Sequence, residues 1–467
     1  MTDLAARRRA AVAVLCAVQF MVVLDSTITT VAVDAIRADL TTDERTLQYV
    51  ISLYAAAFGG LLLLAGRAAD LAGTRRIFIA GTATFTLASL LCAVAPAMPM
   101  LLGGRSAQGA GAAFASAAAF ALLLDLYPEG PGRNRVLGIW ASIGASGAAG
   151  GLILGGVLVD IAGWHLVFAV NVPPGVAAVA VALRVLPAGP SSKPPASRLD
   201  IPGAVTATLG TATLVFAVTR GQAHGWTEPG TVVLVGSAAA LLATFVAVEA
   251  RAPDPLIPLQ SLTRTALPAA AVAIGCLMAV VGSQGFLLVL YLQRISGLGP
   301  TATGLAIAPS ALFALIGSTL AARLASRIPA RTLALTGLLM VATAQVSFGY
   351  LPVDGSYHRH VLPGLLLSGL GLGSAFVGAT IAGTAGLTPA DEGRASGILN
   401  TAQQIGIAVG VATLVSASAV ESTQPEALVT GYHTGLLLGA VVAAAGAGVI
   451  AVRRSSPDVL ARPANDD

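Results

Sequence analysis

The stretch "GRAADLAGTRR", residues 66 to 76, recurs in weaker form as "ARLASRIPART", residues 322 to 332, which begins 256 positions later. Two more pairs follow in the same order. "GAGAAF" from 109 and "GLGSAF" from 371 are 262 positions apart, and "RVLGI" from 135 and "RASGI" from 394 are 259 apart. Near-equal offsets in one order indicate an internal repeat. We therefore predict two homologous halves; chance similarity between Ala- and Gly-rich helices is the alternative for any single pair.

The composition predicts what the repeated unit is made of. Of 467 residues, 55% are hydrophobic and 10% are charged, and the mean hydropathy is +0.82, whereas soluble proteins are about 25% charged. Apolar segments of about 20 residues, the length that crosses a bilayer as a helix, can be marked between charges, Pro and Gly. We predict an all-α polytopic membrane protein with fourteen spans: 10–33, 47–65, 77–96, 99–127, 135–161, 164–187, 201–221, 229–248, 265–291, 302–322, 331–351, 360–388, 394–419 and 432–452.

The basic residues predict the orientation of these spans. With the N-terminus inside, the inner side holds 20 Lys and Arg residues and the outer side 5, while Arg105 remains inside a span. Cytoplasmic loops are enriched in Lys and Arg, so both termini are expected in the cytoplasm. The net charge of +4 is spread over short loops, which argues against nucleic acid as a partner.

The repeat and the spans together divide the chain. Six spans form each half, and the two central spans are an insertion between them. A Pro- and Ser-rich linker, "PAGPSSKPPASRLDIP" at 187–202, follows the first half. The predicted units are an N-terminal half at 1–187, a cytoplasmic linker at 188–200, two inserted helices at 201–248, a second linker at 249–264, a C-terminal half at 265–452 and a cytoplasmic tail at 453–467.

Two charged residues lie within the predicted spans. Asp25, in "VVLDSTITTVAVDAI" at 22–36, precedes the outer end of the first span by nine residues, which places it about 13 Å deep. Arg105 follows the start of the fourth span near Pro99 and lies about 9 Å deep. A charge at the membrane centre costs at least about 2.5 to 3.5 kcal/mol unless it is paired or hydrated, so both residues are candidate functional residues.

Asp34 is a weaker candidate than Asp25. Nine residues place the two carboxylates on opposite faces of one helix, and Asp34 lies at the end of the span, where interfacial water reaches it. A solvated residue at the outer mouth is the favoured interpretation, and a second proton site is the alternative.

The loop between the second and third predicted spans contains a candidate conformational latch. Gly66 and Gly73 permit a tight turn and close helix approach, Asp70 can cap a helix start, and the basic partners are Arg67, Arg75 and Arg76. Charge-assisted bonds of this kind can hold one conformation and break when the halves move. An ordinary positively charged inner loop is the alternative. The second copy has Ser326 for Asp70 and Pro329 for Gly73, so the latch is expected to be asymmetric.

Several motifs now point to a family. The loop resembles the signature G-x-x-x-D-x-x-G-R-R of the major facilitator superfamily, and "LDSTITTVAV" resembles the first-helix signature of its fourteen-helix drug:proton antiporter branch. Other stretches are similar to motifs of that branch: "GGRSAQGAGAA", "GLILGGVLVDIAGWHLVFAVNVPPG", "LVLYLQ", "GLAIAP" and "GRASGILNTAQQIGIAVGVA". They cover nearly the whole chain in order. The departures from these motifs are Thr30, Asp34, Leu152 and His165, where the family has Asn, Pro, Pro and Arg.

The resemblance implies an alternating-access fold with the substrate path between its halves. In that fold the first and fourth helices line one cavity wall, so Asp25 and Arg105 are expected to meet there. We predict that Asp25 carries the coupling proton, that Arg105 stabilises its ionised form, and that movement of the halves separates them. A permanent pair that only fixes helix packing is the alternative.

Other residues have smaller predicted roles. Gly147, Gly151 and Gly155 form a stripe at intervals of four, continued by Gly156, on which another helix can pack. The polar residues expected at the substrate cavity are Thr29, Gln108, Gln284, Tyr291, Asn400, Gln403 and Gln404. The polar groups of the second-half helices, Gln284, Tyr291, Asn400, Gln403 and Gln404, could equally be satisfied by bonds between helices.

The predicted function is export of lipophilic or amphiphilic compounds, such as antibiotics, in exchange for protons across the inner cell membrane. The chain has no Walker-type phosphate loop, HExxH or GxSxG, so we expect no enzyme activity and no catalytic residues. Three cysteines without CxxC spacing predict no metal site and no disulfide framework. We expect no cofactor, and as partners only small molecules, protons and lipid, with a monomeric chain. The alternatives are a symporter or uniporter for a small metabolite, or a membrane enzyme or sensor.

Overall fold

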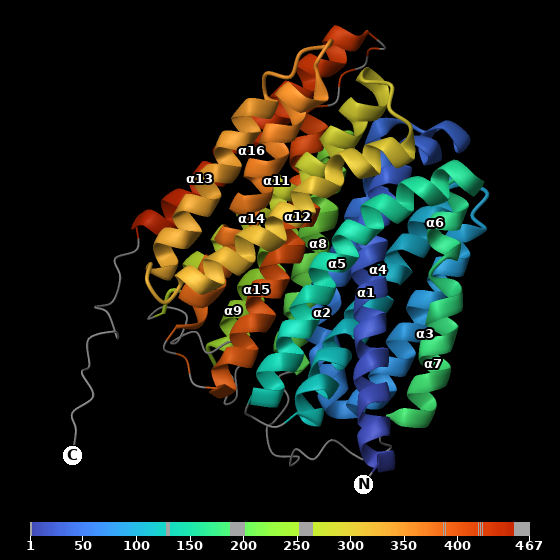
Figure 1. Ribbon diagram of the computed structural model, residues 1–467, viewed down its shortest axis with the longest axis vertical. Helices are drawn as coiled ribbons and strands as arrows, with labels where there is room; N and C mark the ends of the chain where they lie inside the picture. Colours follow the sequence, from blue (N-terminus) through green and yellow to red (C-terminus); the bar gives the residue numbers. More distant parts are fainter. Residues whose placement is uncertain are drawn as a thin grey trace.

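Helices make up nearly all of the described chain in the computed structural model (Figure 1). The structure describes residues 2–127, 131–186, 201–251, 265–385, 387, 389–418, 420, 422 and 424–452. The helices of the N-terminal part are α1 (Thr2–Asp39), α2 (Glu44–Ala72), α3 (Thr74–Ala93), α4 (Met98–Leu126), α5 (Pro131–Ala162), α6 (His165–Ala169) and α7 (Val172–Val185). Two central helices follow, α8 (Ile201–His224) and α9 (Pro229–Glu249).

The C-terminal part repeats this plan, with three one-turn π-helices added. Its helices are α11 (Leu267–Leu290), η1 (Tyr291–Ile295), α12 (Pro300–Leu324), α13 (Ala330–Phe348), η2 (Tyr357–Val361), α14 (Leu362–Thr384), α15 (Pro389–Gly410), η3 (Val411–Val415) and α16 (Pro425–Val452).

Local chemistry explains where these helices begin and end. Asp43 caps α2, where its Oδ1 accepts a hydrogen bond from the Thr46 amide at 2.9 Å. Gly73 separates α2 from α3 with φ of 92°, a value that L side chains rarely adopt. Proline occupies the first turn of α7, α9, α11, α12 and α14, where its missing N–H has no intrahelical partner to lose. Turn-forming residues thus fix the boundaries that hydrophobicity alone leaves open.

Within the described chain, ten helical stretches are long and apolar enough to cross a membrane. They are α1, α3, α4, α6 with α7, α9, α11 with η1, α12, α13, η2 with α14, and α16. Shorter apolar stretches lie in α2 (Tyr49–Leu62), α5 (Gly150–Ala162) and α8 (Val205–Val218). The expected count of fourteen spans stays a prediction.

The predicted span at 164–187 matches one apolar stretch, His165–Val185, within which the helix is interrupted between α6 and α7. Pro173 and Pro174 in the first turn of α7 have no N–H with which to continue the hydrogen-bond ladder of α6. The break leaves Asn171 at the joint, where its backbone oxygen accepts from the Gly175 amide at 3.0 Å.

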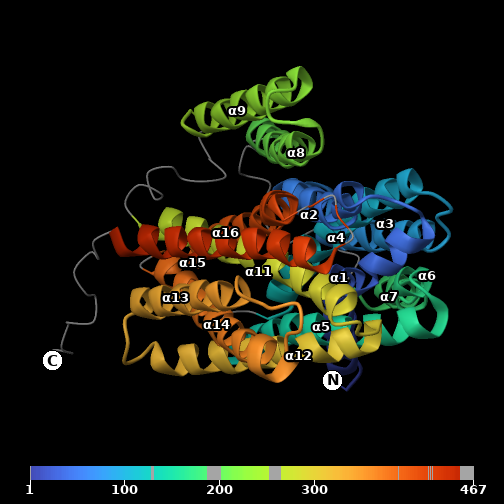
Figure 2. The same ribbon diagram turned by 90° about the horizontal axis from the view of Figure 1, so that it is seen from above.

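The helices form two bundles. The N-terminal bundle (α1 to α7) and the C-terminal bundle (α11 to α16) lie next to each other, and α8 with α9 lies at the periphery beside α2 (Figure 2). The α8 contact is close, because a Cβ at Gly60 would lie 3.4 Å from that of Ala212. The predicted boundaries of the half-chain units are not tested by this arrangement and stay predictions.

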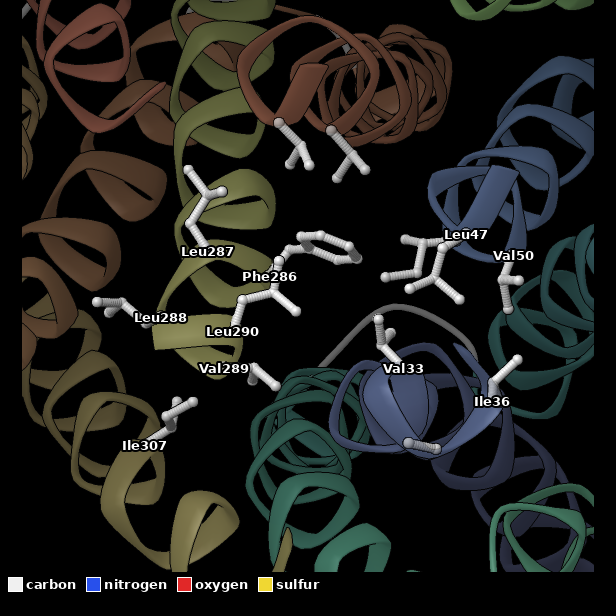
Figure 3. Close-up of a cluster of buried hydrophobic side chains, with 14 of the residues drawn as sticks. Val33, Ile36, Leu47, Val50, Phe286, Leu287, Leu288, Val289, Leu290 and Ile307 are labelled. Carbon is white, nitrogen blue, oxygen red and sulfur yellow. The ribbon is translucent and has the colours of Figure 1, made fainter. Parts of the chain in front are cut away.

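Among the described residues, the large hydrophobic cluster that the two bundles share lies at one end. We call this the distal end; it is the end of α1 away from the N-terminus, uppermost in Figure 1. One buried cluster there combines residues of both bundles, including Val33, Leu47 and Phe286, and Figure 3 shows Phe286 pointing from α11 toward Leu47. Two other large clusters each belong to one bundle. The described structure is therefore closed at the distal end.

Candidate functional site

Asp25 on α1 lies completely buried, with 0% exposure, and three side chains from other helices donate to its carboxylate. Arg105 Nη1 from α4 lies 2.7 Å from Oδ2 and forms an ion pair with it. Gln108 Nε2, also from α4, donates to Oδ1 at 2.8 Å, and Asn171 Nδ2 donates to the same oxygen at 2.7 Å. Three donors, one of them charged, stabilise an ionised carboxylate in an apolar setting.

Further bonds hold Arg105 and Gln108 in place. Arg105 Nε donates to the Val50 carbonyl of α2 at 2.8 Å, and Nη1 also donates to Gln108 Oε1 at 2.7 Å. The guanidinium lies 4.2 Å from the centre of the Tyr54 ring, within the range of a cation–π contact. Gln108 Nε2 also donates to Ser89 Oγ on α3 at 2.8 Å. The cluster thus joins α1, α2, α3, α4 and the α6–α7 joint.

Asp25 lies at the boundary between two hydrophobic clusters. Leu24 and Ile28 belong to the distal cluster that both bundles share, whereas Met21 and Val22 belong to the cluster of the N-terminal bundle alone. Asp25 therefore lies at the border of the cluster that the two bundles share.

The C-terminal bundle has an uncharged cluster at the corresponding place. Gln284 on α11 follows Asp25 by 259 positions, the offset of the "RVLGI" and "RASGI" pair. Its Oε1 accepts from Gln345 Nε2 of α13 at 2.5 Å and from Ser368 Oγ of α14 at 2.8 Å. All three side chains are buried. The internal repeat thus extends to a buried polar cluster in each bundle, but only the cluster around Asp25 contains an ion pair among the residues described.

At the distal end, polar bonds connect the two bundles. Asp34 on α1 pairs with Arg294 on η1 at 3.0 Å and with its neighbour Arg37 at 3.2 Å. Asp160, near the end of α5, accepts from the Thr301 amide in the first turn of α12 at 3.1 Å. The structure therefore places Asp34 in a contact between bundles, remote from the Asp25 cluster.

The loop predicted as a latch is described in part. The side chains of Arg67 and Asp70 lie outside the described residues. Arg76 is exposed. Gly66 lies inside α2, and a Cβ there would meet nothing within 4 Å, so no close helix approach requires glycine at this position. The need for glycine is clear at Gly73 alone, because of its positive φ.

Arg75 binds within its own bundle. Its Nη2 donates to the Leu183 carbonyl in the last turn of α7 at 2.6 Å. Arg331, 256 positions later, donates from Nε to the Ile450 carbonyl in the last turn of α16 at 3.0 Å, and also bonds Ala451. Each arginine thus satisfies carbonyls that the end of a helix leaves without a partner. In this conformation Arg75 acts as a helix cap inside the N-terminal bundle and not as a bond between bundles.

The glycines of α5 face two partners. A Cβ at Gly147, Gly151 or Gly155 would crowd α1, at Val23, Thr27 and Ile28 respectively. A Cβ at Gly156 would instead meet Pro300 and Thr301 of α12. The stripe therefore packs α5 against α1, and Gly156 permits close contact with the other bundle.

The residues expected at the substrate cavity fall into two groups. Thr29 and Gln108 are buried and bonded, Thr29 through Oγ1 to the Asp25 carbonyl at 3.0 Å. Gln284 is buried in the cluster above, and Tyr291 donates to the Pro352 carbonyl at 2.7 Å. Those on α15 are half-buried: Asn400, Gln403 and Gln404.

The family model of the Major Facilitator Superfamily matches residues 15–411. The chain belongs to the major facilitator superfamily. It is accordingly a multi-pass membrane transporter and not an enzyme. The described residues contain no group of three or more His, Cys, Asp or Glu side chains that could hold a metal ion.

Relatives within the superfamily are named for antibiotics. The chain is 37% identical to the cephamycin export protein CmcT of Amycolatopsis lactamdurans, over 91% of this chain and 88% of that protein. It is 36% identical to the puromycin resistance protein pur8 of Streptomyces alboniger, over 91% and 86%. It is 33% identical to the lincomycin resistance protein of Streptomyces lincolnensis, over 86% and 82%.

A solved structure shares the fold at low sequence identity. A bacterial homologue of the human lysosomal transporter Spinster superposes with a TM-score of 0.69 at 15% identity, covering 95% of this chain and 96% of that one. The major facilitator fold is thereby shown over nearly the whole chain.

Within this major facilitator chain, the sequence did not single out Asn171, Ser89 or Tyr54 as site residues. Asn171 was visible inside "FAVNVPPG", a quoted motif, but nothing in the sequence indicated which way its side chain points. Ser89 and Tyr54 are ordinary polar residues of apolar helices, and only the packing brings them to Gln108 and Arg105.

Proposed function

We propose that the protein exports lipophilic or amphiphilic compounds, antibiotics among them, in exchange for protons. The relatives named for cephamycin export and for puromycin and lincomycin resistance support efflux. The observation that carries proton coupling is the buried Asp25 carboxylate with Arg105, Gln108 and Asn171 around it. A titratable group buried within a membrane-spanning helix is typical of a proton pathway.

The proposed cycle follows from the bonds at Asp25. The ionised carboxylate accepts from all three donors, and these bonds join α1 to α4 and to the α6–α7 joint. Protonation removes the charge and leaves Arg105 with only neutral acceptors, Val50 O and Gln108 Oε1. Because a proton shifts a conformational equilibrium only by its different affinity for the two states, the donors around Asp25 must differ between the inward-facing and outward-facing states.

The proposed membrane arrangement extends the ten apolar stretches to fourteen spans by adding α2, α5, α8 and α15. Both termini lie in the cytoplasm and the distal end faces outward, so the described conformation is closed to the outside. The chain then comprises two half-chain units of six spans, with α8 and α9 inserted between them. We place it in the cytoplasmic membrane as a monomer driven by the proton gradient, with no other cofactor.

Proton release on drug binding tests the coupling residue directly. Purified protein in weakly buffered detergent solution is mixed with puromycin, lincomycin or a lipophilic cation, and the pH is followed. Wild type is expected to release protons, and Asp25→Asn to bind the drug without release. Equal release by the two proteins would refute the assignment of Asp25. Asp34→Asn is the matched carboxylate control on the same helix and is expected to release protons as wild type does.

The direction of transport tests the exchange. In proteoliposomes with an imposed pH gradient, an antiporter moves drug against the direction of proton flow. Accumulation of drug on the side toward which protons flow would show a symporter instead.

A further inference from the structure

Asn171 differs from the other two side chains that bind Asp25. It lies at the α6–α7 joint, is 1% exposed, and donates through Nδ2 to Asp25 Oδ1 at 2.7 Å. Arg105 and Gln108 come from a regular helix, α4, and are bound to each other at 2.7 Å. Asn171 is therefore the contact to Asp25 that lies at a break in the helical structure.

The hydrogen bonds of Gln108 leave it little freedom. Its Oε1 accepts from Arg105, and its Nε2 donates to Asp25 and to Ser89. A rotation of this amide would place Oε1 against the carboxylate and Nε2 against the guanidinium, which cannot accept. Gln108 is consequently fixed as a donor to the carboxylate.

The Asn171 amide has a different pattern. Among the described residues, its bond to Asp25 is made by Nδ2, and its Oδ1 has no donor of its own. An ionised carboxylate only accepts hydrogen bonds, whereas a protonated carboxyl has one O–H to donate. Rotation of the Asn171 amide by half a turn would present Oδ1 to that O–H without breaking any other bond of this side chain.

We propose that Asn171 is the positioning residue for the coupling proton: Nδ2 holds the ionised Asp25, and Oδ1 accepts from Asp25 once it is protonated. The inference rests on the proposed role of Asp25. It adds that protonation of Asp25 on α1 changes a hydrogen bond at the α6–α7 joint. A change at Asn171 can affect α7, because the Asn171 carbonyl accepts from Gly175 N at 3.0 Å and so closes the first turn of that helix.

Few other titratable or charged groups face Asp25. Arg105 on α4, Tyr54 on α2 and Cys92 on α3 belong to its surroundings, with Cys92 Sγ 3.8 Å from Gln108 Oε1. The other helices packed against α1 carry their described charged side chains toward their ends, away from this cluster: Asp160 on α5, His165 on α6, Arg184 on α7, Arg294 after α11 and Arg323 on α12. The one further thiol described on these helices, Cys276 in the middle of α11, packs near Gly446 of α16. The pH dependence of Asp25 is therefore governed by the residues of its own cluster.

The first measurement is the pH at which Asp25 titrates, which does not depend on a transport assay. Infrared difference spectroscopy on the purified full-length chain follows the C=O band of a protonated carboxyl during a pH titration, and Asp25→Asn identifies the band. In Asn171→Leu, a near-isosteric change, the ionised carboxylate loses a charge-assisted donor, whereas the protonated carboxyl loses a weaker neutral acceptor. Its titration midpoint is expected to move by about one pH unit toward alkaline pH, and the pH profile of drug transport is expected to move with it.

The C-terminal bundle supplies the matched control. Gln345→Leu removes a buried amide that donates to Gln284 instead of to a carboxylate, so it disturbs packing to a similar degree and is expected to leave the midpoint in place. If Asn171→Leu does not fold, Asn171→Thr serves as the second variant, with a shift in the same direction.

The outcomes separate the two proposals. The absence of any band that disappears in Asp25→Asn would refute proton binding at Asp25, and with it the proposed function. A band that titrates in wild type and keeps the wild-type midpoint in Asn171→Leu would refute the role of Asn171 alone. Equal shifts in the two leucine variants would likewise reduce Asn171 to a packing residue.

Discussion

The bond between Asp25 and Arg105 should be the strongest pairwise interaction inside the N-terminal bundle. In Arg105→Met, Asp25 would stay buried with two amide donors and no positive charge. Removing one partner of a buried ion pair costs about 3 to 5 kcal/mol, because the other charge is left uncompensated. In Asp25→Asn, the buried Arg105 guanidinium is left without a negative partner, and the loss in the free energy of unfolding is expected to be of similar size.

The double variant Asp25→Asn with Arg105→Met should be far milder than the sum of the two. No charge is then left in the cluster, and the main loss is the pair of bonds from Arg105 to the Val50 carbonyl and to Gln108. Two such bonds are worth about 2 kcal/mol together. The coupling energy between the two positions is therefore expected to be at least about 4 kcal/mol.

Unfolding in mixed micelles, followed by tryptophan fluorescence as the denaturing detergent is increased, gives the four free energies of unfolding for this cycle. The neutral cluster provides the comparison, through Gln284→Leu, Gln345→Leu and their double variant. Their coupling is expected near 1 kcal/mol, the usual net value of an uncharged hydrogen bond. A coupling at Asp25 and Arg105 no larger than that of the neutral pair would refute the reasoning, since the pair would then contribute no more than packing.

Three further predictions follow from other parts of the fold. Asp34→Asn removes the pair with Arg294 and should increase labelling of cysteines placed at the distal end, while proton release on drug binding stays as in wild type. Gly304→Val should abolish transport because its Cβ would meet the backbone of α5, whereas Gly66→Val, with nothing within 4 Å, should transport normally. Arg220 and the backbone amides at the start of α9 lower the pKa of Glu228 to about 2. The loss of thermal stability in Glu228→Gln, from thermal scans, should therefore be constant between pH 7 and pH 5 and shrink only below the ordinary pKa of about 4.5.

The sequence predicted the position of the central site for a simple physical reason. Charges are scarce in this chain, so Asp25 and Arg105 stand out within apolar segments, and the regular rise of a helix is enough to compare their depths. The structure pairs them at 2.7 Å. The binding of Gln108 and Asn171 to one carboxylate oxygen of Asp25 could not be predicted from the sequence. An amide carries no charge, and its direction depends on packing.

Other parts of the sequence prediction concerned details that only the three-dimensional packing decides. The span predicted at 164–187 is found as the apolar stretch His165–Val185, but the interruption of its helix at two adjacent prolines does not follow from its continuous hydrophobicity. Gly66 was expected at a close contact, but glycine in a helix also occurs where no neighbour approaches. The latch that includes Arg75 stays a prediction, and in the described conformation Arg75 caps α7. Its repeat partner Arg331 does the same for α16, which the sequence offset of 256 would have allowed us to recognise.

The two buried polar clusters explain why the proposed proton site lies in one bundle only. Asp25 and Gln284 occupy repeat-related places, and both accept hydrogen bonds from side chains of neighbouring helices. The bonds of Gln284 do not change with pH, because neither it nor its partners Gln345 and Ser368 titrate in the physiological range. Of the two clusters, a proton can then alter directly only the one in the N-terminal bundle, and its effect must reach the C-terminal bundle through their shared contacts. In the described conformation the shared core and the pair between Asp34 and Arg294 lie at the distal end, and Asp25 lies at the inner border of that region.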